Sequence, residues 1–142
     1  MKKNIIYSIL SVVLSFSLMS TSCKKKDNCE AGKGGNLTVV AYLKHHGHVI
    51  VNQAGHPDTV FVKFNTQNSP GTSLASYDTY FVGEAGEDHV HLTGLQCGDY
   101  YFYGMGQDTT LDTIQNPHVA GGIPFSTDNT SGEMEFSIPV SE

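Results

Sequence analysis

Apolar and polar residues alternate with a period of two along most of the chain beyond residue 35. The segments 37–43 and 134–140 show this most clearly, with an apolar residue at every second position. Shorter runs of the same kind, each bounded by Gly, Pro, Asn or Asp, cover 59–64, 90–92 and 99–103. Because successive side chains of a strand point to opposite faces of a sheet, this pattern predicts half-buried β-strands.

The predicted strands are short, and no window has apolar residues at the 3.6-residue spacing of a helix. Residues 36–142 are long enough for one small domain. About seven short strands in a domain of this size indicate an all-β fold, an antiparallel β-sandwich.

The first 22 residues have the order of a signal peptide. Lys2 and Lys3 precede an uncharged stretch over 4–22, which is apolar at first and ends in small residues before Cys23. The alternative is a retained transmembrane helix, because 19 uncharged residues approach the length that spans a bilayer. Six serines in the stretch weaken its apolar character and favour cleavage.

The sequence Leu-Met-Ser-Thr-Ser-Cys at 18–23 resembles the lipobox of bacterial lipoproteins, although Ser20 stands where the usual box has leucine. The resemblance implies that the Cys23 thiol carries diacylglycerol, that cleavage precedes Cys23, and that the new amine receives an acyl chain such as palmitate. Each buried methylene contributes about 0.8 kcal/mol, so such an anchor needs no spanning helix. We therefore expect a lipoprotein of the cell envelope, in the outer membrane of a Gram-negative cell.

Charge is distributed unevenly along the chain. Residues 23–35 are rich in lysine and glycine and are predicted to be a lipidated flexible tether, whose lysines can lie against anionic headgroups. From Asn36 onwards two lysines face 12 acidic residues, a net charge of −10, and the chain contains no arginine. Nucleic-acid binding needs a basic surface to neutralise phosphates, so nucleic acid is excluded as a partner.

Assigning Cys23 to lipid leaves Cys29 and Cys97 as the other cysteines. An oxidising compartment would allow them to form a disulfide. Two free thiols, or an intermolecular bond through Cys29, are the alternatives that the sequence leaves open.

The segment Leu-Gln-Cys-Gly-Asp-Tyr at 95–100 resembles the Leu-x-Pro-Gly-x-Tyr turn of prealbumin-like sandwich domains, which include carboxypeptidase regulatory domains and collagen-adhesin B-type repeats. The resemblance implies an Ig-like arrangement in which Gly98 adopts a conformation that a side chain would forbid. It also implies that the Tyr100 hydroxyl bonds to upstream backbone, with Cys97 in the proline position.

The mature chain is also similar over nearly its whole length to small uncharacterised lipoproteins of Gram-negative bacteria. The similarity brings no assigned activity. It is carried by the order of His45-His46, 59–64, 69–71, Tyr77-Asp78, 98–104, 121–124 and 138–140.

Seven histidines in 142 residues suggest metal chemistry. His89 and His91 are two positions apart on a predicted strand and therefore project from the same face. Two imidazoles at this spacing can share Zn²⁺ or Cu²⁺, and a third ligand could come from a turn that contains His45, His46 and His48. The alternatives are ordinary polar surface and pH sensing, and His56 and His118 are interpreted as turn residues.

The sequence favours a non-catalytic function. It has no Gly-x-Ser-x-Gly elbow for a serine nucleophile, and Cys97 lies in a scaffold turn. The first hypothesis is a membrane-anchored binding or structural module that contacts an envelope protein partner and needs no cofactor. Such a module would present an exposed aromatic patch, for which the candidates are Phe61, Tyr80, Tyr101 and Tyr103. The second hypothesis is copper or zinc binding by the histidine clusters.

Overall fold

The computed structural model describes residues 29–109 and 118–142, so the predicted signal peptide, Cys23 and residues 24–28 lie outside the described part. The described residues form eight strands and one short 3-10 turn, η1, over Leu74–Ser76. The strands are β1 (Lys33–His45), β2 (His48–Val49), β3 (Thr59–Phe64), β4 (Thr79–Val82), β5 (Val90–Leu95), β6 (Gly98–Gln107), β7 (His118–Thr127) and β8 (Ser131–Val140).

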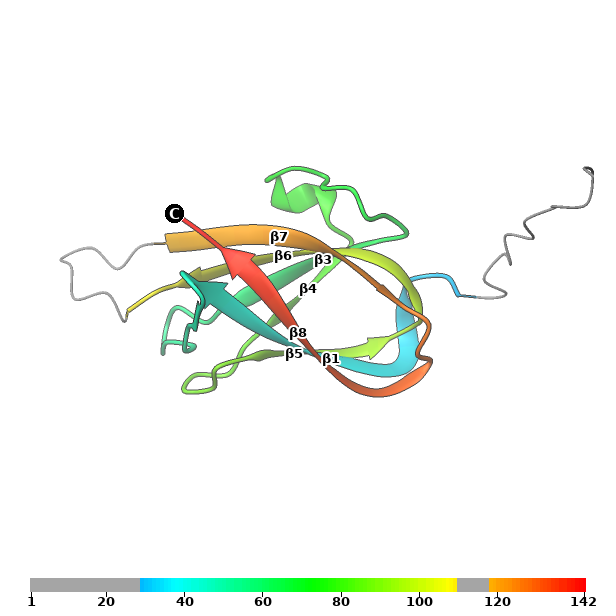
Figure 1. The fold of residues 1–142 in the computed structure, drawn as a ribbon, viewed down its shortest axis with the longest axis horizontal. Coiled ribbons are helices and arrows are strands. Elements are labelled where there is room, and N and C mark those ends of the chain that lie inside the picture. Colours follow the sequence, from blue (N-terminus) through cyan, green and yellow to red (C-terminus); the bar gives the residue numbers. More distant parts are fainter. Residues whose placement is uncertain (1–28, 110–117) are drawn as a thin grey trace, which may run out of the picture.

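Two four-stranded sheets pack against each other (Figure 1). In the first sheet β1 lies between β8 on one side and β2 and β5 on the other. The second sheet has the order β4-β3-β6-β7. The predicted all-β sandwich is confirmed, and the number of strands is close to the seven expected.

One strand pairing departs from the antiparallel prediction. β1 and β8 run parallel, with Asn36 opposite Ser131 and His45 opposite Val140. Parallel neighbours cannot be joined by a tight turn and need a long crossover. Here most of the domain separates the two strands in sequence, because β1 is the first strand of the described chain and β8 is the last.

The core follows the predicted alternation. On β1 the four residues expected to face inwards, Leu37, Val39, Ala41 and Leu43, are buried. Val60, Val62, Val90, Leu92 and Ile138 are also fully buried from the other predicted strands. Burying an aliphatic side chain of this size contributes roughly 1.5–3 kcal/mol, so these positions fix which face of each strand points inwards.

The folded part begins earlier than the sequence indicated. β1 starts at Lys33, and the described chain before it is bonded to the domain: Asn65 accepts from the Ala31 amide at 3.0 Å, and the Gln96 amide donates to Gly32 at 3.0 Å. Residues 29–35, assigned to the tether because they are rich in glycine and lysine, therefore belong to the sandwich. Backbone hydrogen bonds and one disulfide hold them, which composition does not reveal.

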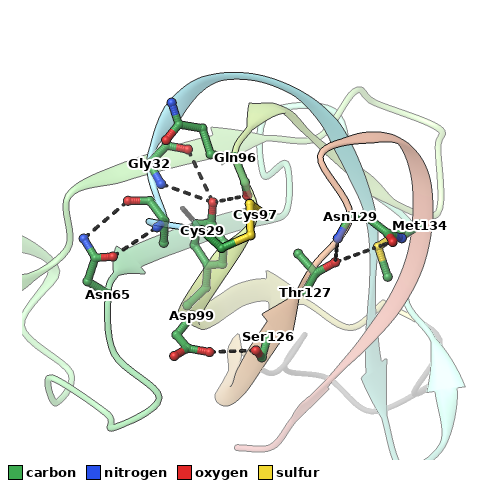
Figure 2. Close-up of a disulfide and its surroundings, with 12 residues drawn as sticks. Cys29, Gly32, Asn65, Gln96, Cys97, Asp99, Ser126, Thr127, Asn129 and Met134 are labelled. Carbon is green, nitrogen blue, oxygen red and sulfur yellow. Dashed lines mark hydrogen bonds between the residues drawn. A yellow bond between two sulfur atoms is a disulfide. The ribbon is translucent and has the colours of Figure 1, made fainter. Parts of the chain in front are cut away.

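The disulfide joins Cys29 to Cys97 across a sequence separation of 68 residues (Figure 2). Beside it the Tyr100 hydroxyl donates to the Gln96 carbonyl at 2.5 Å and accepts from the Gly32 amide at 3.2 Å. Gly98 has φ 142°, and a Cβ atom there would lie 2.4 Å from the Ala31 nitrogen. Both features implied by the 95–100 turn are therefore present, and the turn is part of the scaffold.

The described chain begins at the end of the sandwich that carries the disulfide, and β1 then runs to the opposite end (Figure 1). There His46 and Gly47, with φ 48° and 83°, form the two-residue turn into β2. Positive φ at both central positions is the geometry of a type I′ hairpin. Within residues 29–109 and 118–142, no helix is both long and apolar enough to cross a bilayer.

Candidate metal centre

The start of β5 positions the predicted His-x-His pair. Val90 and Leu92 point into the core and are fully buried, so His89 and His91 project from the outer face of the first sheet. The strand is antiparallel to β1, with Val40 opposite His91. The orientation predicted for the two imidazoles is confirmed.

Three potential ligand atoms converge at this position. The Nε2 atoms of His89 and His91 are 3.0 Å apart, and Oε2 of Glu87 lies 3.6 Å from Nε2 of His89. One ligand atom from each of these residues lies within 4.8 Å of the other two. Zinc–nitrogen bonds of 2.0–2.1 Å at a tetrahedral angle place two nitrogens about 3.3 Å apart, so the side chains are already near coordination spacing.

The neighbouring carboxylate of Asp88 orients His89. Its Oδ1 atom lies 2.8 Å from His89 Nδ1. This contact favours the tautomer in which Nδ1–H donates to Asp88 and Nε2 keeps its lone pair for a metal or for the Nε2–H of His91. A carboxylate on the far nitrogen of a ligating histidine is the usual second partner at metal sites, and it fixes the orientation of the ring.

The surroundings favour a cation. Glu135 on β8 and His91 on β5 lie on either side of Val40, about 10 Å apart at ordinary strand spacing. The pKa of the Tyr42 phenol is raised, first by partial burial and then by the charges of Glu135 and Asp88. The ring of Tyr42 packs 5.6 Å from that of His89.

The second histidine cluster does not complete this site. The His45 side chain continues the buried face of β1, is 2 % exposed, and bonds through Nδ1 to Oδ2 of Asp108 at 2.8 Å. It lies four residues beyond Ala41, the partner of Val90, which is about 13 Å along the strand. The expected joint site of His89 and His91 with His45, His46 or His48 is therefore not formed among the described residues.

The hairpin histidines instead meet a different acid. Ligand atoms of His45, His46 and Glu142 lie within 4.8 Å of one another, and the exposed His48 is not part of this group. The inward orientation of His45 could have been found in the sequence, since it is in phase with Leu37 and Leu43. Its contacts with Asp108 and Glu142 could not, because they depend on how distant strands pair.

Glu87 is a potential ligand that the histidine pattern of the sequence does not identify. The sequence does contain one indication: Glu87 and Asp88 directly precede His89, and a turn at this point can bring their carboxylates close to the imidazoles. His56 lies at a turn as predicted, but His118 is the first residue of β7 and pairs with Gln107, so its interpretation as a turn residue is wrong. Both histidines line a hollow of about 310 Å³ beside Phe61 and Met105. Neither belongs to a three-residue group of potential ligands in the described chain.

The outer face of the second sheet carries an aromatic cluster. Phe61 is opposite Tyr80 on β4 and Tyr103 on β6, and its ring lies 5.8 Å from that of Tyr80. Tyr77 joins them, 6.0 Å from Phe61 and 5.7 Å from Tyr103. Burial, with smaller contributions from Tyr101 and Tyr103, raises the pKa of Tyr77 to about 12. We call Phe61, Tyr77, Tyr80 and Tyr103 the aromatic face; Tyr80 is 61 % exposed.

Comparisons with protein-family models, with curated proteins and with solved structures found no match to this chain.

Proposed function

We propose that this protein is a lipid-anchored lipoprotein of the cell envelope whose sandwich binds a transition-metal ion at Glu87, His89 and His91. The observation that carries the binding proposal is the 3.0 Å separation of the two Nε2 atoms with a carboxylate oxygen 3.6 Å from one of them. Two imidazoles and one carboxylate suit Zn²⁺ and Cu²⁺, and they leave a coordination position for water or for a further ligand.

The anchor is supported by the sequence. An uncharged stretch precedes Cys23, and three lysines follow it directly. Labelling cells with radioactive palmitate tests this proposal. We expect label in the wild-type protein and none in Cys23→Ala, whereas Cys29→Ala should keep its label. Label that persists in Cys23→Ala would disprove lipid attachment at this residue.

Metal binding is tested by calorimetric titration of the detergent-solubilised protein with Zn²⁺ and Cu²⁺. Replacing both His89 and His91 by alanine should weaken binding at this site at least tenfold, or by about 1.4 kcal/mol. Thr93→Ala is the matched control, because Thr93 is the next exposed residue on the same face of β5. Equal affinity in the wild type and the double variant would refute this site.

A second candidate function is contact with another envelope protein through the aromatic face. Two observations favour it: Tyr80 and Val82 are 61 % and 49 % exposed, and four aromatic rings contact one another beside them. Exposed apolar patches of this kind mark interaction surfaces. A photo-crosslinking residue at position 80 should give one adduct of defined mass in intact cells, and Phe61→Ser should abolish it. A ladder of adducts that Phe61→Ser leaves unchanged would contradict a specific contact.

A further inference from the structure

A second group of potential ligands lies at the end of the sandwich where the β1–β2 hairpin meets the end of β8. The register of the parallel pair places His45 opposite Val140, so Glu142 follows two residues after the partner of His45. Ser141 is held in place by two backbone hydrogen bonds with Ala120, of 2.8 and 3.0 Å. The backbone just before Glu142 is therefore paired on both sides, and this pairing places Glu142 beside the hairpin.

His45 is the informative member of this group. Its side chain is almost completely buried, and Nδ1 is bonded to Asp108 at 2.8 Å. Nε2 is also buried and has no hydrogen-bond partner within residues 29–109 and 118–142. Burying a polar atom without a partner is unfavourable, so a ligand at Nε2 would offset this penalty.

The carboxylate of Asp108 sets the chemistry of this nitrogen. With Nδ1–H donated to Asp108, Nε2 carries the lone pair and can bind a metal ion. The ring of His46 lies 4.1 Å from that of His45, and the exposed carboxylate of Glu142 completes a set of three ligand atoms within 4.8 Å. His46 and Glu142 are exposed, so small side-chain rotations can close the remaining distance to zinc coordination.

We infer that His45, His46 and Glu142 form a second metal site, a zinc site, in which Asp108 is the positioning residue. It is separate from the site on β5, because the two groups share no residue and His45 points into the core whereas His89 and His91 project from the outer face. An ion bound here would join the β1–β2 hairpin to the residues that follow β8. Its main consequence is to stabilise this end of the sandwich, since a ligand that binds the native state raises its stability.

The two sites are separated by titrating the full-length protein in detergent with Zn²⁺ and following stoichiometry by calorimetry. The wild type should bind two zinc ions, and His46→Ala should bind one. The variant with both His89 and His91 replaced by alanine should also bind one, with unchanged affinity at the hairpin. His48→Ala is the control, because this exposed histidine of the same hairpin lies outside the group and should leave the stoichiometry at two.

The outcomes distinguish this inference from the proposed function. If His46→Ala and Glu142→Gln bind as much zinc as the wild type, the hairpin site is refuted while the β5 site stands. If the variant with both His89 and His91 replaced binds as much zinc as the wild type, while His46→Ala and Glu142→Gln bind less, the β5 site is refuted and the hairpin site stands. A single zinc ion in the wild type that depends on His89 and His91 also refutes the hairpin site.

Nitrogen-15 spectroscopy of the imidazoles tests which atom binds. Zinc should shift the Nε2 resonance of His45 and leave its Nδ1 in the protonated form. Asp108→Asn should weaken zinc binding at the hairpin by 10- to 100-fold, as loss of an outer carboxylate does at other metal sites. If the Nε2 resonance does not move at saturating zinc, His45 is not a ligand.

Discussion

Replacing Asp58 by asparagine should remove a pH dependence from the stability of the domain. Asp58 is 1 % exposed and directly precedes β3, and among the described residues its carboxylate has no side-chain hydrogen-bond partner, while the backbone of Gln107 lies against it. Its Oδ1 lies against Gly106, where an added Cβ would approach it to 2.3 Å, and beside Ile50. Burial raises its pKa from 3.8 to about 6, and the backbone of Gln107 opposes this shift in part.

The sign of the effect follows from proton linkage. Between about pH 4 and pH 6 the folded state keeps a proton that the unfolded chain has already released. The free energy of unfolding therefore falls as pH rises through this window and is level above it. A shift of about two pKa units corresponds to about 3 kcal/mol, at 1.36 kcal/mol per unit.

The measurement is urea unfolding of residues 23–142, with Cys23 replaced by serine, followed by circular dichroism between pH 4 and pH 7. At pH 4 the wild type and Asp58→Asn both have a neutral side chain at position 58. Between pH 4 and pH 7 the variant should gain about 2 kcal/mol relative to the wild type, less than the full value because more than half of the unfolded chains have already lost this proton at pH 4. Differences in packing cancel in this comparison, and so does the lowered pKa of Asp78, because both proteins contain it.

Glu84→Gln is the control for a change of net charge, because Glu84 is exposed. It should leave the pH profile of the wild type unchanged. Parallel profiles for the wild type and Asp58→Asn over this range would refute the claim that burial raises the pKa of Asp58 in the folded state.

Three further predictions concern the disulfide end of the sandwich. Replacing Cys29 and Cys97 by serine frees a loop of 68 residues and should lower the free energy of unfolding by about 4 kcal/mol, measured by urea unfolding. Tyr100→Phe removes the hydroxyl that bonds to Gln96 and Gly32 and should cost about 1–2 kcal/mol in the same assay. Gly98→Ala places a Cβ against Ala31 and should lower Tm more than Gly86→Ala, because both glycines have a positive φ but only Gly86 has open space around it.

The alternation in the sequence predicted the fold well because burial on one face determines the phase of a strand. The phase of β1, from Leu37 to Leu43, and that of β8, from Met134 to Val140, were both confirmed. The parallel pairing of these two strands was not predictable. It is decided by the whole path of the chain, and apolar alternation is the same for parallel and antiparallel neighbours.

The alternation of inward and outward positions also separates the two histidine clusters. His45 follows Leu43 at the inward positions of β1, whereas His89 precedes the inward Val90 on β5 and so faces outwards. Grouping the histidines by residue type alone placed them in one site. Partners contributed by distant segments, such as Asp108 and Glu142, have no local signal, and they determine what each histidine can bind.

The position of the two candidate sites fits the proposed anchor. Both lie towards the end of the sandwich away from Cys29, because β5 starts beside Ala41 and the hairpin follows His45. Five residues separate Cys23 from Cys29, a reach of at most about 20 Å. Lys33 and Leu37 both pair with Leu95, so the straight part of β1 runs from Leu37 to His45, roughly 26 Å away from the disulfide. A lipid at Cys23 would therefore hold the disulfide end near the membrane and leave the metal sites facing the surrounding compartment, where ions and partners can reach them.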